Sequence, residues 1–269
     1  DAGAAYVFTR SGTSWSQQAK IVSSDIQAGD YFGEYLAIDG DTIVVGAIGE
    51  DTGGSGAGAA YVFTRSGTTW SQQAKIVSSD IAASDKFGTG VSIDGDTVVV
   101  GAYMEADGQG AAYIFTRSGT SWSQQAKIVA SDGSAGERFG NTVSISSDSV
   151  VVGSYYDYDG GANAGSAYVF TRSGTTWSQQ AKIQSSDIAA GDKFGSSVSI
   201  EGDTVVVGVD YQDTGGVNAG AAYVFTRSGT TWTQAKKLVA SDAQANDLLG
   251  FSVDISGNTV VAGARGEDT

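Results

Sequence analysis

Short apolar runs alternate with glycine- and serine-rich turns along the whole chain. In the stretch that begins at Phe32, four such runs cover residues 34–38, 42–47, 59–65 and 69–76. The runs are rich in β-branched and aromatic residues, which favour the pleated surface of a sheet. No segment of ten or more residues keeps the apolar periodicity of an amphipathic helix. The pattern therefore predicts an all-β protein, and we name the four runs strands A, B, C and D.

The segments between the runs predict how the strands are joined. An Asp-Gly pair at 39–40 follows strand A and is a strong signal for a two-residue hairpin turn. A Ser-Gly pair at 66–67 joins strands C and D, a glycine-rich acidic loop over 48–58 joins B to C, and residues 77–86 lead to the next unit. Strand B is apolar on both faces, so we expect it to lie between two neighbouring sheets.

The same unit recurs five times. Two aromatic markers, a Trp in strand D and the Tyr of an Ala-Tyr-x-Phe motif in strand C, return with spacings of 55, 52, 55 and 55 residues. The markers are Trp15, Trp70, Trp122, Trp177 and Trp232, with Tyr6, Tyr61, Tyr113, Tyr168 and Tyr223. Four antiparallel strands repeated at a period of about 50 residues indicate propeller blades. We therefore expect the repeated aromatic residues to pack between blades, and the alternative is that exposed Trp faces stack on sugars.

The strands at the two ends of the chain predict a closed ring. The chain starts in strand C and ends after strand B, so the two ends together would supply one complete blade. We expect a single five-bladed β-propeller over residues 1–269, closed by pairing of the N-terminal strands C and D with the C-terminal strands A and B. The expected blades are residues 32–76, 87–128, 139–183, 194–238, and 249–269 together with 1–21.

The motifs of the unit resemble FG-GAP repeats. The clearest copy reads Asp-Lys-Phe-Gly at 192–195, Gly-Asp-Thr-Val-Val-Val-Gly at 202–208 and Gly-Ala-Ala-Tyr-Val-Phe at 220–225. FG-GAP repeats build the propellers of integrin α subunits and of many bacterial surface proteins, and the bacterial type is the more similar. The resemblance implies a propeller that works in adhesion or ligand binding outside the cell. The family's propellers commonly have more blades than the five units found here.

The resemblance also bears on calcium. The calcium loop of the integrin type carries Asp at alternate positions before a Gly, and only residues 157–160, Asp-Tyr-Asp-Gly, come near that pattern. Asp157 and Asp159 are therefore the candidate metal ligands, and Ca²⁺ is the candidate cofactor. A complete set of about six to eight oxygen ligands, as Ca²⁺ prefers, is not evident in any one loop.

Composition narrows the chemistry further. The chain has 30 acidic and 15 basic residues, a formal charge of −15, and neither His nor Cys. The missing residue types exclude a Ser-His-Asp triad, a cysteine nucleophile and an ordinary zinc site. The negative charge disfavours nucleic acid and anionic membrane surfaces. No run approaches the roughly 20 apolar residues of a membrane span. We expect no nucleic-acid partner, no membrane insertion and no catalytic residues.

The B–C loops and the D–A connectors are expected on one face of the propeller, which we call the loop face. Only the B–C loops vary in length between units, and variation on a fixed scaffold commonly carries binding specificity. Each of these loops holds a pair of acids, and the connectors add more, so the loop face should be acidic. The candidate ligand-binding residues are Glu50, Asp51, Glu105, Asp107, Asp157, Asp159, Asp210, Asp213, Glu267 and Asp268.

Other roles for these charged residues stay open. Connector Asp side chains can accept hydrogen bonds from backbone N–H groups of their own turn, and acidic loops can keep a glycine-rich surface soluble. Paired acids that recur in every unit disfavour a glycosidase, which needs one asymmetric pair. Basic residues recur as regularly, which indicates either solvation of strand edges or pairing with acids across strands, and not a basic patch. They are Arg10, Arg65, Arg117, Arg172 and Arg227, with Lys20, Lys75, Lys127, Lys182 and Lys236.

Together these features predict a non-enzymatic adhesion or ligand-binding module whose ligand, an extracellular protein or a glycan, lies on the loop face of a monomeric ring. Extracellular placement rests on the family resemblance and on a chain that starts at Asp1 instead of Met. Two alternatives stay open. One is a purely structural or engineered repeat scaffold without a small-molecule ligand, and the other is a multivalent, lectin-like propeller that binds glycans.

Overall fold

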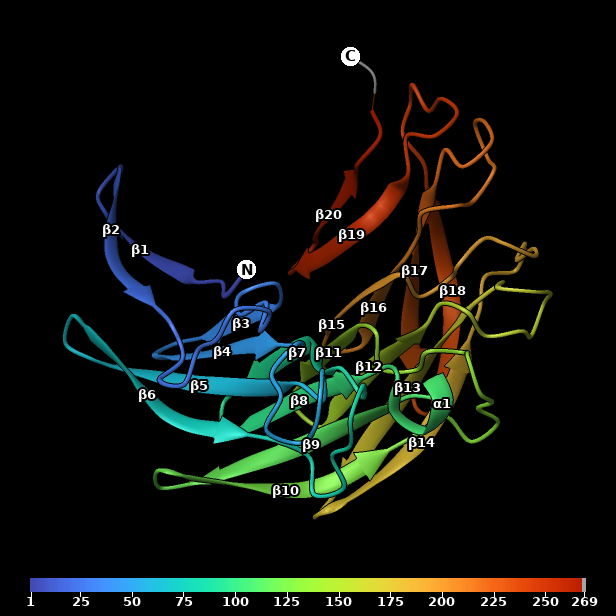
Figure 1. Ribbon diagram of the computed structural model, residues 1–269. Helices are drawn as coiled ribbons and strands as arrows, with labels where there is room; N and C mark the ends of the chain where they lie inside the picture. The colour runs from blue at the N-terminus through green and yellow to red at the C-terminus, as the bar shows by residue number, and fades with distance from the viewer. Residues whose placement is uncertain (268–269) are drawn as a thin grey trace.

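Antiparallel β-sheets make up nearly all of the regular structure in the computed structural model, which describes residues 1–267. In that range, twenty strands form six sheets that follow one another in a curved row (Figure 1). The expected all-β class is confirmed. None of the helical segments described has the length and apolar character needed to cross a membrane.

Four of the sheets contain four strands in the order A, B, C, D. The first has β3 (Leu36–Asp39), β4 (Thr42–Ala47), β5 (Ala59–Ser66) and β6 (Thr69–Ile76); the second has β7 (Phe87–Asp94), β8 (Thr97–Ala102), β9 (Ala111–Ser118) and β10 (Ser121–Ile128). The third has β11 (Val143–Ser146), β12 (Ser149–Ser154), β13 (Ser166–Ser173) and β14 (Thr176–Ile183); the fourth has β15 (Ser197–Glu201), β16 (Thr204–Val209), β17 (Ala221–Ser228) and β18 (Thr231–Leu238). One helical turn, α1 (Glu105–Gly108), lies in the second B–C loop.

Each four-stranded sheet is a simple meander, as the turn signals predict. Strand β4 pairs with β5 from Thr42 opposite Thr64 to Ala47 opposite Ala59. Strands C and D are offset by a bulge, which in the first sheet lies between Val62 and Phe63. The bulge recurs in the other units and leaves one residue of strand D unpaired, which shifts the register of the residues beyond it.

The core lies between neighbouring sheets. Val44 and Val62 of the first sheet share one buried cluster with Val91 and Val100 of the second. The Phe of the Phe-Gly motif enters this layer: the ring of Phe87 is fully buried, with its centroid 5.6 Å from that of Tyr113. Apolar residues on both faces of strand B are thus covered, as expected for a strand between two sheets.

The repeated tryptophans bind across the sheets through their indole N–H groups. Trp70 Nε1 donates to Gln18 Oε1 of the preceding unit at 2.8 Å. Trp122, Trp177 and Trp232 make the equivalent bond to Gln73, Gln125 and Gln180. The marker tyrosines of the four-stranded sheets are fully buried. Packing of the aromatic residues between units is therefore confirmed for these four units.

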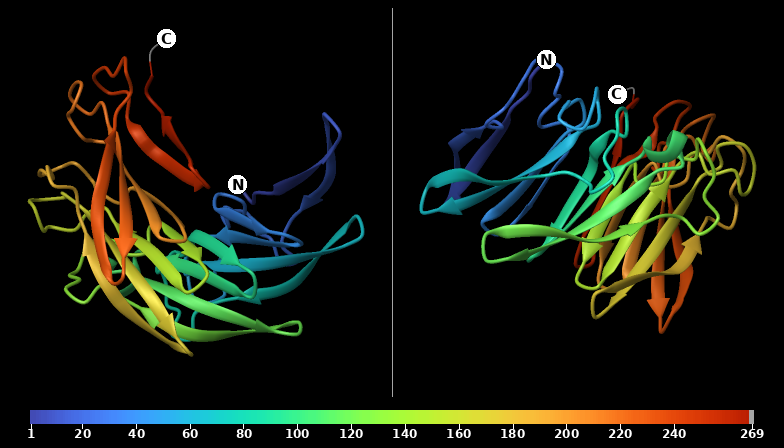
Figure 2. Two further views of the ribbon diagram at one scale, coloured as in Figure 1. Left: turned by 180° about the vertical axis from the view of Figure 1, so that it is seen from behind. Right: turned by 60° about the horizontal axis from the view of Figure 1, so that its bottom comes forward.

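The two ends of the row are half-blades, and here the expectation of a closed ring is not met. Strand β1 (Ala5–Ser11) pairs only with β2 (Ser14–Ile21), and β19 (Leu249–Ser256) only with β20 (Thr259–Ala264), within the residues described. Figures 1 and 2 show the two hairpins apart, at opposite ends of the row. The pairing of N-terminal strands C and D with C-terminal strands A and B is thus absent from this structure.

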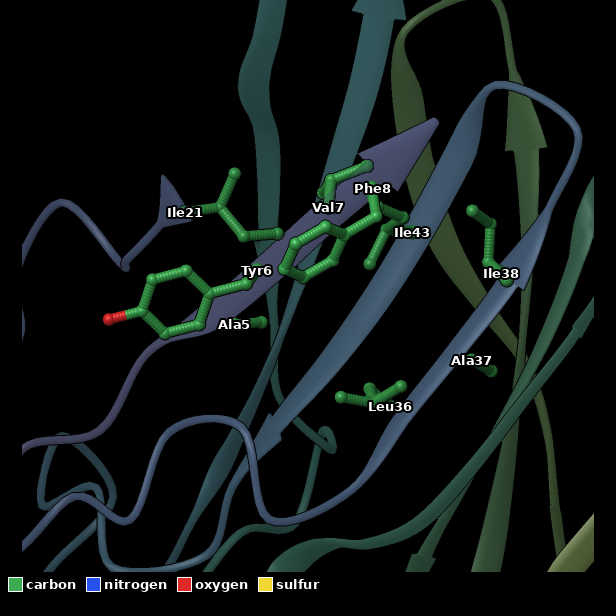
Figure 3. Close-up of a pocket in the computed structure, with 9 residues that line it drawn as sticks. All are labelled: Ala5, Tyr6, Val7, Phe8, Ile21, Leu36, Ala37, Ile38 and Ile43. Carbon is green, nitrogen blue, oxygen red and sulfur yellow. The ribbon is translucent and has the colours of Figure 1, made fainter. Parts of the chain in front are cut away.

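The missing neighbour leaves apolar side chains uncovered on the first sheet. Leu36 in strand A is 57% exposed, whereas Val91, its counterpart in the second sheet, is 9% exposed. Val91 packs against strands B and C of the sheet before it. The hairpin that precedes β3 contains strands C and D, β1 and β2, but no strand B. An apolar hollow of about 150 Å³ results, lined by residues such as Val7, Phe8, Leu36 and Ile38 (Figure 3).

Candidate functional site

The acids of the loop face are gathered around lysines from strand D. In the first sheet, Lys75 Nζ lies 2.7 Å from Asp25 Oδ2 in the preceding connector and 2.8 Å from Glu50 Oε1 in the B–C loop. The buried Tyr61 hydroxyl donates to the other oxygen of Asp25 at 2.8 Å, and the ammonium lies 5.5 Å from the Tyr61 ring centroid. We call this arrangement the lysine cluster.

The lysine cluster recurs with changes in the acids. Lys127 pairs with Asp80 and Glu105. Lys182 has three carboxylates within 3.0 Å, those of Asp132, Asp157 and Asp159. In the fourth sheet the lysine is Lys237, which pairs with Asp187 and also donates to Thr214 Oγ1. Pairing of the repeated basic residues with acids is confirmed for these units, but the expected Lys236 is wrong. Lys237 lies opposite Tyr223, as Lys75 lies opposite Tyr61, and follows Trp232 at the same spacing as Lys75 follows Trp70.

The arginines make the corresponding pairs at the opposite end of the strands, beside the A–B turns. Arg65 binds Asp41 in the A–B turn, and Arg117, Arg172 and Arg227 bind Asp96, Asp148 and Asp203. These aspartates are mostly exposed, and exposed ion pairs contribute about 1 kcal/mol or less.

The lysine clusters lower the pKa values of their connector aspartates. Burial alone would raise the pKa of Asp25, but hydrogen bonds from Lys75 and Tyr61 outweigh it and hold that pKa below its ordinary value. Asp80, Asp132 and Asp187 show the same direction for the same reasons. Because these folded-state pKa values are lowered, the stabilisation is present above the ordinary carboxyl pKa and is lost as pH falls through the folded value.

The structure separates the candidate ligand-binding acids into two groups. Glu50, Glu105 and Asp157 are turned inward to the lysines, and Asp157 is only 2% exposed. Asp51 and Asp213 are exposed, and each accepts a backbone N–H of its own loop, from Gly56 at 2.7 Å and from Asn218 at 2.8 Å.

The remaining candidates differ from one another. Asp107 is exposed within α1, and Asp159 is exposed although it binds Lys182. Asp210 is buried in a separate pocket. Glu267 is exposed and has an interaction partner, and Asp268 lies outside the described residues.

The connector acids are accounted for within their own turns. Asp30 Oδ2 accepts the backbone N–H of Gln27 at 2.6 Å, and Asp85, Glu137, Asp192 and Asp247 accept the equivalent bond. This confirms that Asp in the connector satisfies a backbone donor of its own turn.

The candidate calcium ligands do not fit a metal ion in this arrangement. Asp157 Oδ2 and Asp159 Oδ2 both lie against Lys182 Nζ, at 3.0 and 2.6 Å, and a second cation at these oxygens would meet the ammonium charge. No group of three or more acidic side chains among residues 1–267 is arranged to hold a metal ion.

A second feature of the loop face is a pocket on the inner side of the row, which we call the inner pocket. Its volume is about 460 Å³, and its lining includes Tyr35, Tyr156, Lys193, Asp210, Tyr211 and Arg265. These residues come from four units, at the starts of A strands and just after B strands. Of the residues that line the pocket, only Asp210 is among the candidate ligand-binding residues, because those candidates are the paired acids of the B–C loops.

A comparison of the units position by position would have revealed the inner pocket. The residues that directly follow strand B are Ile48, Tyr103, Tyr155, Asp210 and Arg265. Four residue types at five equivalent positions would be unremarkable in an ordinary chain, but here the preceding strand is nearly the same in every unit. The units therefore differ from one another at the positions after strand B, several of which line the pocket.

The sequence repeats match a known family over most of the chain. A family model described as the FG-GAP repeat matches five times, at residues 15–63, 70–115, 122–170, 177–225 and 232–269. No curated protein matches the chain. Five matches that cover far more than half of the residues, on a row of four-stranded antiparallel sheets, show that the chain belongs to the FG-GAP repeat family.

Proposed function

We propose that this chain is a non-catalytic, extracellular binding module that contacts its ligand through the loop face. The observation that carries the proposal is the contrast between the two faces. The C–D turns read Ser-Gly-Thr in each unit and the A–B turns keep one length, whereas the B–C loops change in both length and composition. FG-GAP propellers are often binding or adhesion domains, which supports the same conclusion.

The chemistry of the B–C loops suits a protein or glycan partner. Tyr158 and Val217 are large exposed side chains at the loops of the third and fourth units, and they stand beside the exposed acids Asp159 and Asp213. Apolar anchors next to carboxylates are typical of polar-rimmed binding surfaces. We propose that the exposed candidates Asp51, Asp107, Asp159 and Asp213 contact the ligand, while Glu50, Glu105 and Asp157 hold the loops in place.

Binding by bead-coupled protein to a panel of purified extracellular-matrix proteins and glycans tests this proposal. Beads present many copies, so weak sites become measurable. The loop-face variant Tyr158→Ser/Val217→Ser should weaken binding about tenfold or more, because two apolar contacts are lost. The control Thr175→Ala/Thr230→Ala changes exposed C–D turns of the same two units and should bind as the unmodified chain does. Equal loss in both variants, or no binding to any panel member, would favour the scaffold alternative.

We also propose that the row closes into a five-bladed ring, in which β20 pairs with β1. Leu36, Ile38 and Val261 are each more than half exposed, although their counterparts in the four-stranded sheets are buried. Docking of the β19–β20 hairpin beside β1 would cover all three, and burial of apolar surface is favourable by about 25 cal/mol per Å².

Disulfide trapping tests closure, since the chain has no Cys of its own. Val99 lies opposite Ile114 in the second sheet, and the same register places Val261 opposite Val7. The double variant Val7→Cys/Val261→Cys should therefore form an intramolecular disulfide under mild oxidation, because facing residues of paired strands meet the distance requirement. The single variants are the controls. A disulfide-linked dimer would mean that the edges pair between copies, and absence of any cross-link would mean that the row stays open.

A further inference from the structure

The inner pocket is the place where near-identical units become different from one another. Tyr155 and Tyr156 occupy the two positions after strand B in the third unit, Asp210 and Tyr211 occupy them in the fourth, and Arg265 follows strand B in the fifth. Packing alone does not require such differences, because the sheets themselves repeat. A pocket of about 460 Å³ built from four different units is instead a single asymmetric site of a size that suits a small ligand.

One wall of the inner pocket carries a buried acceptor without a partner. Asp210 is 5% exposed, and its Oδ1 has no hydrogen-bond partner among the residues described. Burial raises the pKa of this carboxyl group, while the nearby charges of Lys193 and Arg265 act in the opposite direction. A buried polar atom left unpaired costs about 1–3 kcal/mol, so a ligand that donates a hydrogen bond to Oδ1 would be favoured there.

The same pocket holds basic side chains that are not part of the lysine clusters. Lys193 Nζ lies 3.5 Å from the ring centroid of Tyr211 and 5.9 Å from that of Tyr156. Arg265, also in the lining, covers the ring of Phe251. Arg138 is not in the lining but lies over Tyr156, 4.6 Å from its ring centroid. In a chain of charge −15, whose other lysines mostly bind acids, the inner pocket is a local site of positive charge.

Aromatic rings complete the lining. The rings of Tyr155 and Tyr156 lie 4.3 Å apart, and the Tyr155 hydroxyl accepts a hydrogen bond from Arg138 at 2.7 Å. Tyr35 and Tyr211 contribute further rings. Flat apolar surfaces beside fixed polar groups orient a ligand that has a ring face and polar substituents.

We propose that the inner pocket binds an acidic sugar, meaning a monosaccharide unit that carries a carboxylate. The carboxylate would lie at Lys193 and Arg265, a sugar hydroxyl would donate to Asp210 Oδ1, and the C–H face of the ring would lie on the tyrosines. A neutral sugar leaves the cations without a partner, and a simple carboxylate leaves Asp210 Oδ1 without a donor. The inference rests on the proposed binding role of the loop face, and it names the ligand class.

Calorimetry with galacturonic acid and galactose tests the proposal, since the two sugars differ only in a carboxylate and a hydroxymethyl group at one carbon. At constant ionic strength, galacturonic acid should bind at least about tenfold more tightly than galactose, because bonds to a charged group are stronger than neutral ones. Lys193→Gln should remove that preference and leave the affinity for galactose unchanged.

Lys86→Gln is the matched control. Lys86 holds the same place before Phe-Gly in the second unit and also has a positive φ, 59° against 61° for Lys193. Its Nζ lies beside Gly56 in a B–C loop, so Lys86→Gln should keep the preference for the acidic sugar. Equal loss in both variants would show general charge attraction and would overturn the proposal.

The failure of this inference and that of the proposed function are distinguishable. If neither sugar binds while Tyr158→Ser/Val217→Ser still abolishes binding to a panel member, the acidic-sugar site is wrong and the loop-face function stands. If galacturonic acid binds but Lys193→Gln has no effect, the site is elsewhere and the inference is wrong. If the loop-face variant binds the panel as the unmodified chain does, and galacturonic acid binds in a Lys193-dependent way, the inner pocket is the functional site.

Discussion

Lys182→Met is expected to lower the free energy of unfolding by about 3 kcal/mol or more. Lys182 is the one cation among three carboxylates, and Asp157, the innermost of them, is 3% exposed in its side chain. Removal of the ammonium leaves that carboxylate buried with only the Tyr168 hydroxyl and one backbone N–H as donors. Urea titration followed by tryptophan fluorescence measures the change.

The fourth sheet supplies a natural control for this prediction. Lys237 pairs with Asp187 in the same geometry, but a neutral Gln212 stands where the third sheet has Asp157. Lys237→Met should therefore cost only about 1 kcal/mol, as expected for a pair with a half-exposed carboxylate. Adding Asp157→Asn to Lys182→Met should restore part of the lost stability, because the orphaned charge is removed. Losses of equal size for Lys182→Met and Lys237→Met would refute the role given to Asp157.

The strands could be predicted from the sequence because each local signal agrees with the others. Asp-Gly at 39–40, the β-branched run at 42–47 and the Ser-Gly turn at 66–67 each favour one structure. The β-branched run and the Ser-Gly turn recur in every unit, and an A–B turn of the same length recurs with them. Closure of the ring could not be settled in this way. Complementary strand types at the two ends show that β1 and β20 could pair, but the pattern holds no information on how far apart the curvature of the row places them.

The role of the acids depended on side chains from distant parts of the chain. Asp157 and Asp159 resemble a metal loop in sequence, yet the ammonium that lies on them comes from strand D, more than twenty residues later. Lys237 and not Lys236 binds Asp187 because Lys237 holds the place after Trp232 that Lys75 holds after Trp70. The spacing from the recurring Trp therefore identifies the lysine, whereas its acidic partners come from other parts of the fold.

The inner pocket could not be predicted from the recurring pattern of residues. Most of its lining residues differ from unit to unit, whereas the candidate acids of the B–C loops recur. In a chain of near-identical units, Asp210 and Arg265 are informative because their counterparts Ile48 and Tyr103 share neither charge nor shape with them.

Gly101→Ala is expected to have the other large effect, a loss of at least about 3 kcal/mol in the free energy of unfolding. Gly101 lies near the end of strand β8, where the next sheet approaches most closely. A Cβ atom there would lie 1.8 Å from the carbonyl oxygen of Gly140 and 2.4 Å from that of Thr89. Both contacts are with backbone atoms, so no side chain can rotate away and the sheets must separate. Gly46, Gly153 and Gly208 show the same close approach, as the recurring glycine predicts.

Gly119→Ala separates this steric effect from a general intolerance of glycine replacement. Gly119 lies in a C–D turn with a φ of 62°, and an added Cβ would meet nothing within 4 Å. The cost there is the left-handed backbone alone, about 1–2 kcal/mol. Thermal and urea unfolding of the two variants should therefore differ clearly, with Gly101→Ala the less stable. If both lose the same amount, the sheets can slide apart without cost, and close contact between units is not what holds the row together.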